Sequence, residues 1–258
     1  MKRGSIDLNA DVGEGAGSDD DLVPLVSSVN IACGAHAGDE ATMRQTIALA
    51  LRHGTAIGAH PGFADRENFG RRELSISPAA AAGLVLGQAR MLRSMAEGLG
   101  AGVGHVKLHG ALYNMAARDA ALANAIAAAL AADSLNSGRN WILVALAGSV
   151  LATVARERGL RVVGEAFADR SYRRDGSLTP RTDPGAVIAD ADVASRQALR
   201  IATEGIVRSA DGSDVGVDAE TICLHGDGPS AVEFARRIRL CLADAGVAVQ
   251  PPSKGAHA

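Results

Sequence analysis

The chain has 258 residues, of which 47% are hydrophobic and 21% charged, so it can bury a sizeable core and is too apolar for wholesale disorder. Its formal net charge of -3 gives no electrostatic basis for binding nucleic acid. The sequence contains no apolar run of about 18 residues, no signal-peptide core and no C-x-x-C pair among its three cysteines. We therefore expect a reduced, cytoplasmic protein that neither crosses a membrane nor binds nucleic acid.

Short apolar runs of strand length alternate with longer segments whose apolar residues recur at helical spacing. In chain order, strands are predicted at 5–9, 28–33, 55–59, 104–108, 141–146, 161–165 and 221–224. Helices are predicted at 38–52, 77–99, 116–132, 148–158, 185–204 and 229–245. Gly54 after the first helix and Ser77-Pro78 at the start of the second are typical helix-boundary signals.

This order of elements predicts an α/β fold, an irregular (β/α)7 TIM-like barrel, in preference to a doubly wound sheet. We expect one barrel domain over 1–258, with a small hairpin inserted around 206–219. Two polar segments, 62–77 and 170–184, are predicted as long loops over a pocket. In such a barrel the C-terminal ends of the strands open on one face, where catalytic groups gather.

Polar side chains follow several of the predicted strands. Asp7, Asn9 and Asp11 are spaced by two residues and therefore share one strand face. Asp11 is nearest to the predicted pocket, with Glu14 just beyond it. For Asp7 and Glu14 the alternatives are structural: a hydrogen-bond network on the barrel floor and a role in the turn.

His36 and His60 follow adjacent strands, so with Asp11 they can approach one divalent cation. Two imidazoles and a carboxylate suit Zn²⁺, Mn²⁺ or Fe²⁺. No local metal-binding motif is present, and a metal-free pair of histidines that binds substrate or acts as a base is the alternative. Cys33 lies inside a strand and is interpreted as core packing rather than as a thiol nucleophile.

Lys107 and His109 lie two residues apart and share a strand face, where a desolvated lysine can polarise a carbonyl or bind an anion. The residues after His109 are expected to form a turn that places Tyr113 at the pocket rim. Further acids, an arginine and a histidine follow the sixth and seventh strands, with ion pairing inside the loop as the alternative: Glu165, Asp169, Arg170, His225 and Asp227.

Six blocks of this sequence resemble the signature blocks of the LamB/YcsF family, in order, from about residue 5 to residue 250. They are Asp7-Leu-Asn-Ala-Asp-Val-Gly-Glu14, Ser28-Val-Asn-Ile-Ala-Cys-Gly-Ala-His-Ala-Gly-Asp39, Gly58-Ala-His-Pro-Gly62 with Phe69-Gly-Arg-Arg72, His109-Gly-Ala-Leu-Tyr-Asn114, Glu165-Ala-Phe-Ala-Asp-Arg-Ser-Tyr172 and His225-Gly-Asp227. The resemblance implies an irregular barrel related to that of the polysaccharide deacetylases, which often hold a metal with Asp and His ligands. It also implies the activity of a 5-oxoprolinase, in which an A subunit works with partner subunits B and C. That enzyme opens 5-oxoproline (pyroglutamate) to L-glutamate and uses ATP, with Mg²⁺.

For that activity, Asp11, Lys107, His109 and Glu165 are assigned to catalysis: Asp11 or Glu165 activates water, and the cations stabilise the developing charge. The other candidates are assigned to substrate binding, with an arginine holding the carboxylate: Asn9, His36, His60, Arg71, Arg72, Tyr113, Asp169, Arg170, His225 and Asp227. The alternatives are a non-catalytic regulatory subunit or a stand-alone metal-dependent deacetylase or amidohydrolase. Three points stay open at this stage: a bound divalent metal, the location of the ATP site among the subunits, and a homo-oligomer.

Overall fold

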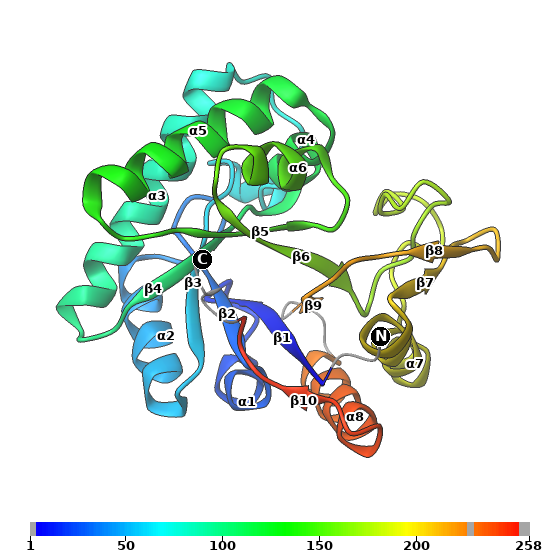
Figure 1. Ribbon diagram of the computed structural model, residues 1–258. Helices are drawn as coiled ribbons and strands as arrows, with labels where there is room; N and C mark the ends of the chain where they lie inside the picture. Colours follow the sequence, from blue (N-terminus) through cyan, green and yellow to red (C-terminus); the bar gives the residue numbers. More distant parts are fainter. Residues whose placement is uncertain (1–3, 226–229, 253–258) are drawn as a thin grey trace.

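The computed structural model describes residues 4–225 and 230–252, and its centre is a closed barrel of seven parallel strands (Figure 1). The strands are β1 (Ser5–Val12), β2 (Ser28–Ala32), β3 (Ala56–His60), β4 (Val103–Lys107), β5 (Ile142–Leu146), β6 (Arg161–Phe167) and β9 (Thr221–His225). Each pairs in parallel with the next in this order, and β9 closes the ring on β1. The predicted (β/α)7 barrel is thereby confirmed. A short strand, β10 (Ala248–Val249), pairs with the start of β1.

Helices surround the barrel on its outside (Figure 1). They are α1 (Asp19–Leu22), α2 (Glu40–His53), α3 (Pro78–Gly98), α4 (Gly110–Arg118), α5 (Ala120–Ser137), α6 (Val150–Glu157), α7 (Ala191–Glu204) and α8 (Ala231–Asp244), with the 3-10 turns η1 (Val23–Leu25) and η2 (Arg66–Asn68). The predicted boundary signals of α2 and α3 are confirmed. Ser77 caps α3 by accepting from the Ala80 N–H, and Gly54 ends α2 with a φ of 67°.

The segment after His109 is a helix, so the predicted turn there is wrong. Its first residue, Gly110, has a φ of 55°, and a Cβ at this position would lie 2.6 Å from the carbonyl oxygen of Gly70. Asp119 ends α4 and caps α5, because its carboxylate accepts from two backbone N–H groups of the first turn of α5. The helix predicted over 116–132 is therefore two helices, since this cap interrupts an otherwise continuous helical pattern.

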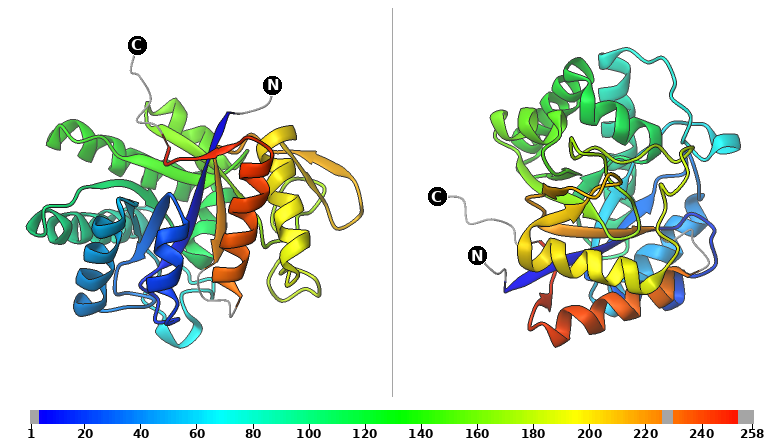
Figure 2. Two further views of the ribbon diagram at one scale, coloured as in Figure 1. Left: turned by 90° about the horizontal axis from the view of Figure 1, so that it is seen from below. Right: turned by 90° about the vertical axis from the view of Figure 1, so that its right-hand side faces the viewer.

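The chain is irregular ahead of α7, and the helix begins at Ala191 rather than at the predicted residue 185, because the Asp190 carboxylate caps it there. β7 (Ile206–Arg208) and β8 (Asp214–Gly216) form an antiparallel pair that projects from the barrel beside α7 (Figure 1). Figure 2 shows α7 and α8 packed side by side next to this pair.

Within the described residues no single helix is long and apolar enough to cross a membrane, although α4 and α5, bent by 107°, meet that test as a pair.

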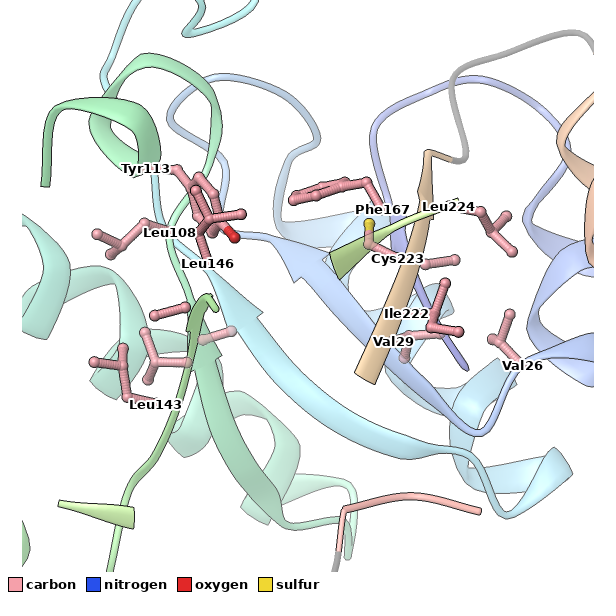
Figure 3. Close-up of a cluster of buried hydrophobic side chains, with 14 of the residues drawn as sticks. Val26, Val29, Leu108, Tyr113, Leu143, Leu146, Phe167, Ile222, Cys223 and Leu224 are labelled. Carbon is pink, nitrogen blue, oxygen red and sulfur yellow. The ribbon is translucent and has the colours of Figure 1, made fainter. Parts of the chain in front are cut away.

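Side chains of β1 alternate between two environments, as expected for a strand. The even-numbered residues from Ile6 to Val12 belong to the apolar core. Figure 3 shows part of this core, including Val29 on β2, Leu143 on β5 and Cys223 on β9. Asp7, Asn9 and Asp11 lie on the other face, where each hydrogen-bonds to buried polar groups of neighbouring strands. The fold therefore places a row of polar groups inside the barrel, and the row ends at the C-terminal edge of β1.

Candidate functional site

Lys107 lies at the centre of the polar network inside the barrel. Its Nζ lies 2.9 Å from Asp11 Oδ1 and 2.9 Å from Glu165 Oε1, and it contacts Cys223 Sγ at 3.0 Å. Burial by itself would lower the pKa of Lys107, but the Asp11 carboxylate holds it well above its usual value. Burial would likewise raise the pKa of Asp11, yet His60 and Lys107 hold it well below its usual value. The site therefore contains a lysine cation fixed between two carboxylates.

Two buried amides hold these carboxylates, and a histidine holds one of the amides. Asn9 Nδ2 donates to Glu165 Oε1 at 3.0 Å. Asn30 Nδ2 donates to Asp11 Oδ1 at 2.9 Å and to Asn9 Oδ1 at 2.8 Å. His105 Nε2 in turn donates to Asn30 Oδ1 at 2.9 Å. Asn9, predicted to bind substrate, thus lies behind the carboxylates and positions them.

A cluster of histidines around Glu14 lies next to Asp11. The three imidazoles approach one carboxylate oxygen, Glu14 Oε1, at 3.2 Å (His36 Nε2), 3.3 Å (His109 Nδ1) and 3.8 Å (His60 Nε2). One ligand-type atom of each of these four residues lies within 4.8 Å of the others. Asp11 Oδ2 lies 3.4 Å from His60 Nε2, at the edge of the cluster. The structure therefore groups the two predicted metal ligands His36 and His60 with Glu14 and His109, and Asp11 is bonded instead to Lys107.

Backbone carbonyls fix the orientation of two of these rings. His60 Nδ1 donates to the carbonyl of Lys107 at 2.9 Å, and His109 Nε2 donates to the carbonyl of Phe69 at 2.8 Å. When both imidazoles are neutral, the lone pairs of His60 Nε2 and His109 Nδ1 therefore face each other at 2.9 Å. Such a contact needs a cation beside the two nitrogens, either a proton or a metal ion. Histidines that bind a metal commonly give their other N–H to a backbone carbonyl in this way.

The charges of the cluster also fit a divalent cation. Burial lowers the pKa of His36 to about 4 despite the nearby Glu14, so this imidazole is neutral and keeps a lone pair. Burial would lower the pKa of His60, but Asp11 raises it, so a proton on His60 is the alternative to a metal ion. With neutral histidines, the three carboxylates among the described side chains of the site, Asp11, Glu14 and Glu165, exceed the one ammonium, Lys107, by two negative charges. A divalent ion that prefers imidazole and carboxylate ligands would balance them.

Glycines leave room for the histidine cluster. His36 and His109 stack with their ring centroids 3.7 Å apart. A Cβ on Gly62 would lie 2.9 Å from His36 Nδ1, and a Cβ on Gly70 would lie 2.9 Å from His36 Cβ. Phe69 adopts a φ of 54°, which is unusual for a residue with a side chain, and its carbonyl accepts the hydrogen bond from His109. The segment 62–77 therefore forms one wall of the histidine cluster.

A separate histidine–aspartate pair ends β9 and β6. His225 Nδ1 lies 2.8 Å from Asp169 Oδ2, and the His225 backbone N–H donates to the same oxygen at 3.1 Å. Burial would raise the pKa of Asp169, but His225 holds it below its usual value. Phe167 stacks on the His225 ring with the centroids 5.5 Å apart. Asp169 holds Nδ1 of this ring, and His225 lines the cavity at the C-terminal ends of the strands.

These groups line a small cavity of about 40 Å³ at the C-terminal ends of the strands. Its walls include Asp11, His60, Lys107, His109, Tyr113 and His225. Tyr113 is buried and donates to Glu165 Oε2 at 2.8 Å, so it lies inside the wall and not at the rim. Arg71 and Arg170 also line the cavity, whereas Arg72 is exposed and pairs with Asp65 at 3.5 Å, outside the lining. The remaining candidate, Asp227, lies outside the described residues.

Some residues of the site are not selected by sequence reasoning. For Glu14 the sequence offers a structural role in a turn as the alternative. Its position three residues after Asp11 nevertheless places it at the C-terminal end of the same strand. Asn30 shares one face of β2 with Ser28, so strand alternation marks it as an inward polar residue. Arg181 lines the cavity from the irregular segment before α7, where no strand end signals it.

Comparisons with known proteins agree on one family. The chain matches the model of the LamB/YcsF family over residues 6–257. It is 51% identical over 251 residues to the A subunit of 5-oxoprolinase from Bordetella pertussis, which covers 95% of this chain and 98% of that protein. Among solved structures, the lactam utilization protein from Thermus thermophilus superposes with a TM-score of 0.86 at 45% identity, over 95% of this chain and 99% of that one. A peptidoglycan N-acetylglucosamine deacetylase domain from Eubacterium rectale has a TM-score of 0.51 at 11% identity, over 96% of this chain and 88% of that one, which shows a related fold.

Proposed function

This chain belongs to the LamB/YcsF family, and we propose that it is the A subunit of an ATP-dependent 5-oxoprolinase, which hydrolyses 5-oxo-L-proline to L-glutamate. The observation that carries the proposal is the 51% identity to a protein of that name across nearly the whole of both chains. The likeness to a lactam utilization protein supports the same substrate class, a cyclic amide. Subunits B and C are the proposed partners, and ATP with Mg²⁺ is the proposed co-substrate.

The chemistry explains why ATP is needed. A lactam is a poor electrophile, because its nitrogen donates electron density to the carbonyl group. Transfer of the terminal phosphoryl group of ATP to the lactam oxygen makes the carbonyl carbon reactive and creates a leaving group. Water then adds to this carbon, and the ring C–N bond breaks as the nitrogen takes up a proton, which leaves γ-glutamyl phosphate. A second water hydrolyses this acyl phosphate to glutamate and phosphate. We assign the ring-opening step to the cavity of this chain.

Asp11 is the group we assign to the attacking water. Asp11 lines the cavity. Its Oδ1 accepts hydrogen bonds from Lys107 and Asn30, whereas its Oδ2 lies 3.4 Å from His60 Nε2. Oδ2 can therefore accept a proton from water without breaking the network behind it. Lys107 is already bonded to Asp11 and Glu165, so its role is to fix these carboxylates and to stabilise negative charge through space.

His225 is the group we assign to the leaving nitrogen. Asp169 orients it through Nδ1, so Nε2 can donate a proton to the ring nitrogen as the C–N bond breaks. Glu14, His36, His60 and His109 would hold a divalent cation, which would polarise the lactam oxygen and lower the pKa of bound water. His36 and His60, predicted to bind substrate, are thus proposed as ligands.

The test is coupled formation of glutamate and ADP by a purified mixture of this chain with subunits B and C. We expect turnover of 5-oxoproline that depends on this chain and on ATP, and we expect Asp11→Asn to abolish it. Asp244→Asn, an exposed change on α8, is the matched control and should keep full activity. Full activity of Asp11→Asn would remove Asp11 from the mechanism, and equal turnover without this chain would favour a non-catalytic role.

A metal-dependent amide hydrolase that works alone is the second candidate, and the cluster around Glu14 favours it. The two candidates differ in their need for ATP. Hydrolysis of an amide by the isolated chain, without ATP and lost on chelation, would establish the second candidate. Loss of coupled turnover on omission of ATP supports the first.

A further inference from the structure

Arg71, Arg170 and Arg181 line the cavity. Arg170 is 4% exposed, and its guanidinium is bonded to the backbone. Its Nε donates to the carbonyl of Ala186 at 3.1 Å, and one terminal nitrogen donates to the carbonyl of Thr179 at 2.5 Å. Arg170 therefore links distant parts of the segment 170–188 to one another, and we do not assign it to substrate binding.

Further contacts fix this segment against the barrel. The Tyr172 side chain is fully buried, and its hydroxyl accepts from the Phe167 N–H at 2.7 Å. Arg170 and Val187 form an antiparallel bridge, and Gln197 of α7 donates to the Arg170 carbonyl at 2.8 Å. The segment is thus anchored at both ends, and its middle part carries Arg181 to the cavity wall.

Arg71 and Arg181 reach the same cavity from separate segments, 62–77 and 170–188. The Arg71 guanidinium lies 4.7 Å from the centroid of the Phe69 ring, which holds it beside the histidine cluster. Burial and the nearby Arg181 lower the pKa of Arg170 to about 10, so the arginines lie within electrostatic range of one another. The wall therefore carries concentrated positive charge in a cavity that also contains Asp11.

An anionic substrate needs such a wall. A carboxylate that enters this cavity loses part of its hydration and therefore needs a positively charged partner, whereas a neutral lactam does not. A guanidinium matches a carboxylate with two parallel hydrogen bonds. We propose that Arg181, together with Arg71, binds the substrate carboxylate and determines specificity for 5-oxoproline over neutral lactams. This inference rests on the proposed function, and it makes Arg170 a positioning residue.

Kinetics of the complete three-subunit mixture test the inference. Arg181→Ala should raise KM for 5-oxoproline about 10- to 100-fold, the loss of a charge-assisted pair, with a much smaller change in kcat. Arg181→Lys should recover part of this loss, because lysine restores the positive charge but not the two parallel N–H donors of a guanidinium. The control is Arg173→Ala, which removes an exposed arginine of the same segment that pairs with Asp183, and its KM should match that of the unaltered chain.

A second substrate shows which anionic group Arg181 contacts. In 5-oxoprolinamide a neutral amide replaces the carboxylate, and the lactam is unchanged. Arg181→Ala should leave kcat/KM for this analogue, or its inhibition constant if it is not turned over, within about twofold of the unaltered chain. An equal loss for both compounds would mean that Arg181 contacts the ring or the phosphoryl group, and would overturn the inference. An unchanged KM for 5-oxoproline would also overturn it, whereas absence of any turnover by the unaltered mixture would reject the proposed function itself.

Discussion

Replacement of Lys107 by methionine tests the buried charge network most sharply. Methionine is similar in length but cannot pair with Asp11 and Glu165, each 2.9 Å from the ammonium. Removal of one partner from a buried ion pair typically costs about 3–5 kcal/mol, because the remaining charge is left uncompensated. Here two carboxylates lose their counter-ion, so we expect a loss of at least about 3 kcal/mol in the free energy of unfolding.

Urea denaturation followed by circular dichroism, in the presence of a chelator, measures this loss without a contribution from bound metal. The control is Arg118→Met, which breaks the exposed pair with Glu73 and should cost no more than about 1 kcal/mol. The double variant with Glu165→Gln should lose less than the sum of the two single changes, since one unpaired charge is then absent. A loss for Lys107→Met as small as that of the control, or strictly additive losses, would refute the argument.

Three further predictions concern stability and metal binding. Burial raises the pKa of Asp7 from 3.8 to about 6, so the folded state binds the proton of this carboxyl group more tightly than the unfolded state does. The proton therefore adds to the free energy of unfolding below pH 3.8, and this contribution is lost as the pH rises through 6. Urea titrations should therefore show that the unaltered chain loses about 3 kcal/mol more than Asp7→Asn between about pH 4 and about pH 7, and parallel curves would contradict the assignment. Glu14→Gln should lower the amount of Zn²⁺, Mn²⁺ or Fe²⁺ that copurifies, measured by plasma mass spectrometry, at least about tenfold, while equal metal in both proteins would exclude Glu14 as a ligand. Gly62→Ala should weaken metal binding and activity with little change in the circular-dichroism spectrum, because the new Cβ would lie 2.9 Å from His36 Nδ1; unaltered metal affinity would show that the cluster can shift.

Strand alternation accounts for what the sequence predicts best. Polar residues two apart on β1 must share a face, and consecutive parallel strands must end at one edge, so the convergence of Asp11, His60 and Lys107 follows from the pattern alone. The same rule applies to Asn30 on β2. Boundaries are also predictable where a cap or a glycine marks them, as at both ends of α2.

Geometry outside the strands explains the rest. The placement of His109 depends on the carbonyl of Phe69, and the start of α4 depends on a close approach between Gly110 and Gly70, neither of which leaves a periodic signal. Arg170 has the chemistry of a substrate clamp, but its donors go to backbone carbonyls that no side-chain pattern reveals. Arg181 reaches the cavity only because the segment 170–188 folds back over the barrel.

The most direct measurement is a crystal structure of this chain with 5-oxoproline bound. We predict that the lactam occupies the cavity at the C-terminal ends of the strands, with its carbonyl carbon beside Asp11 and its carboxylate on Arg181. Density for 5-oxoproline elsewhere on the chain, with that cavity empty of it, would contradict the assignment of ring opening to this site.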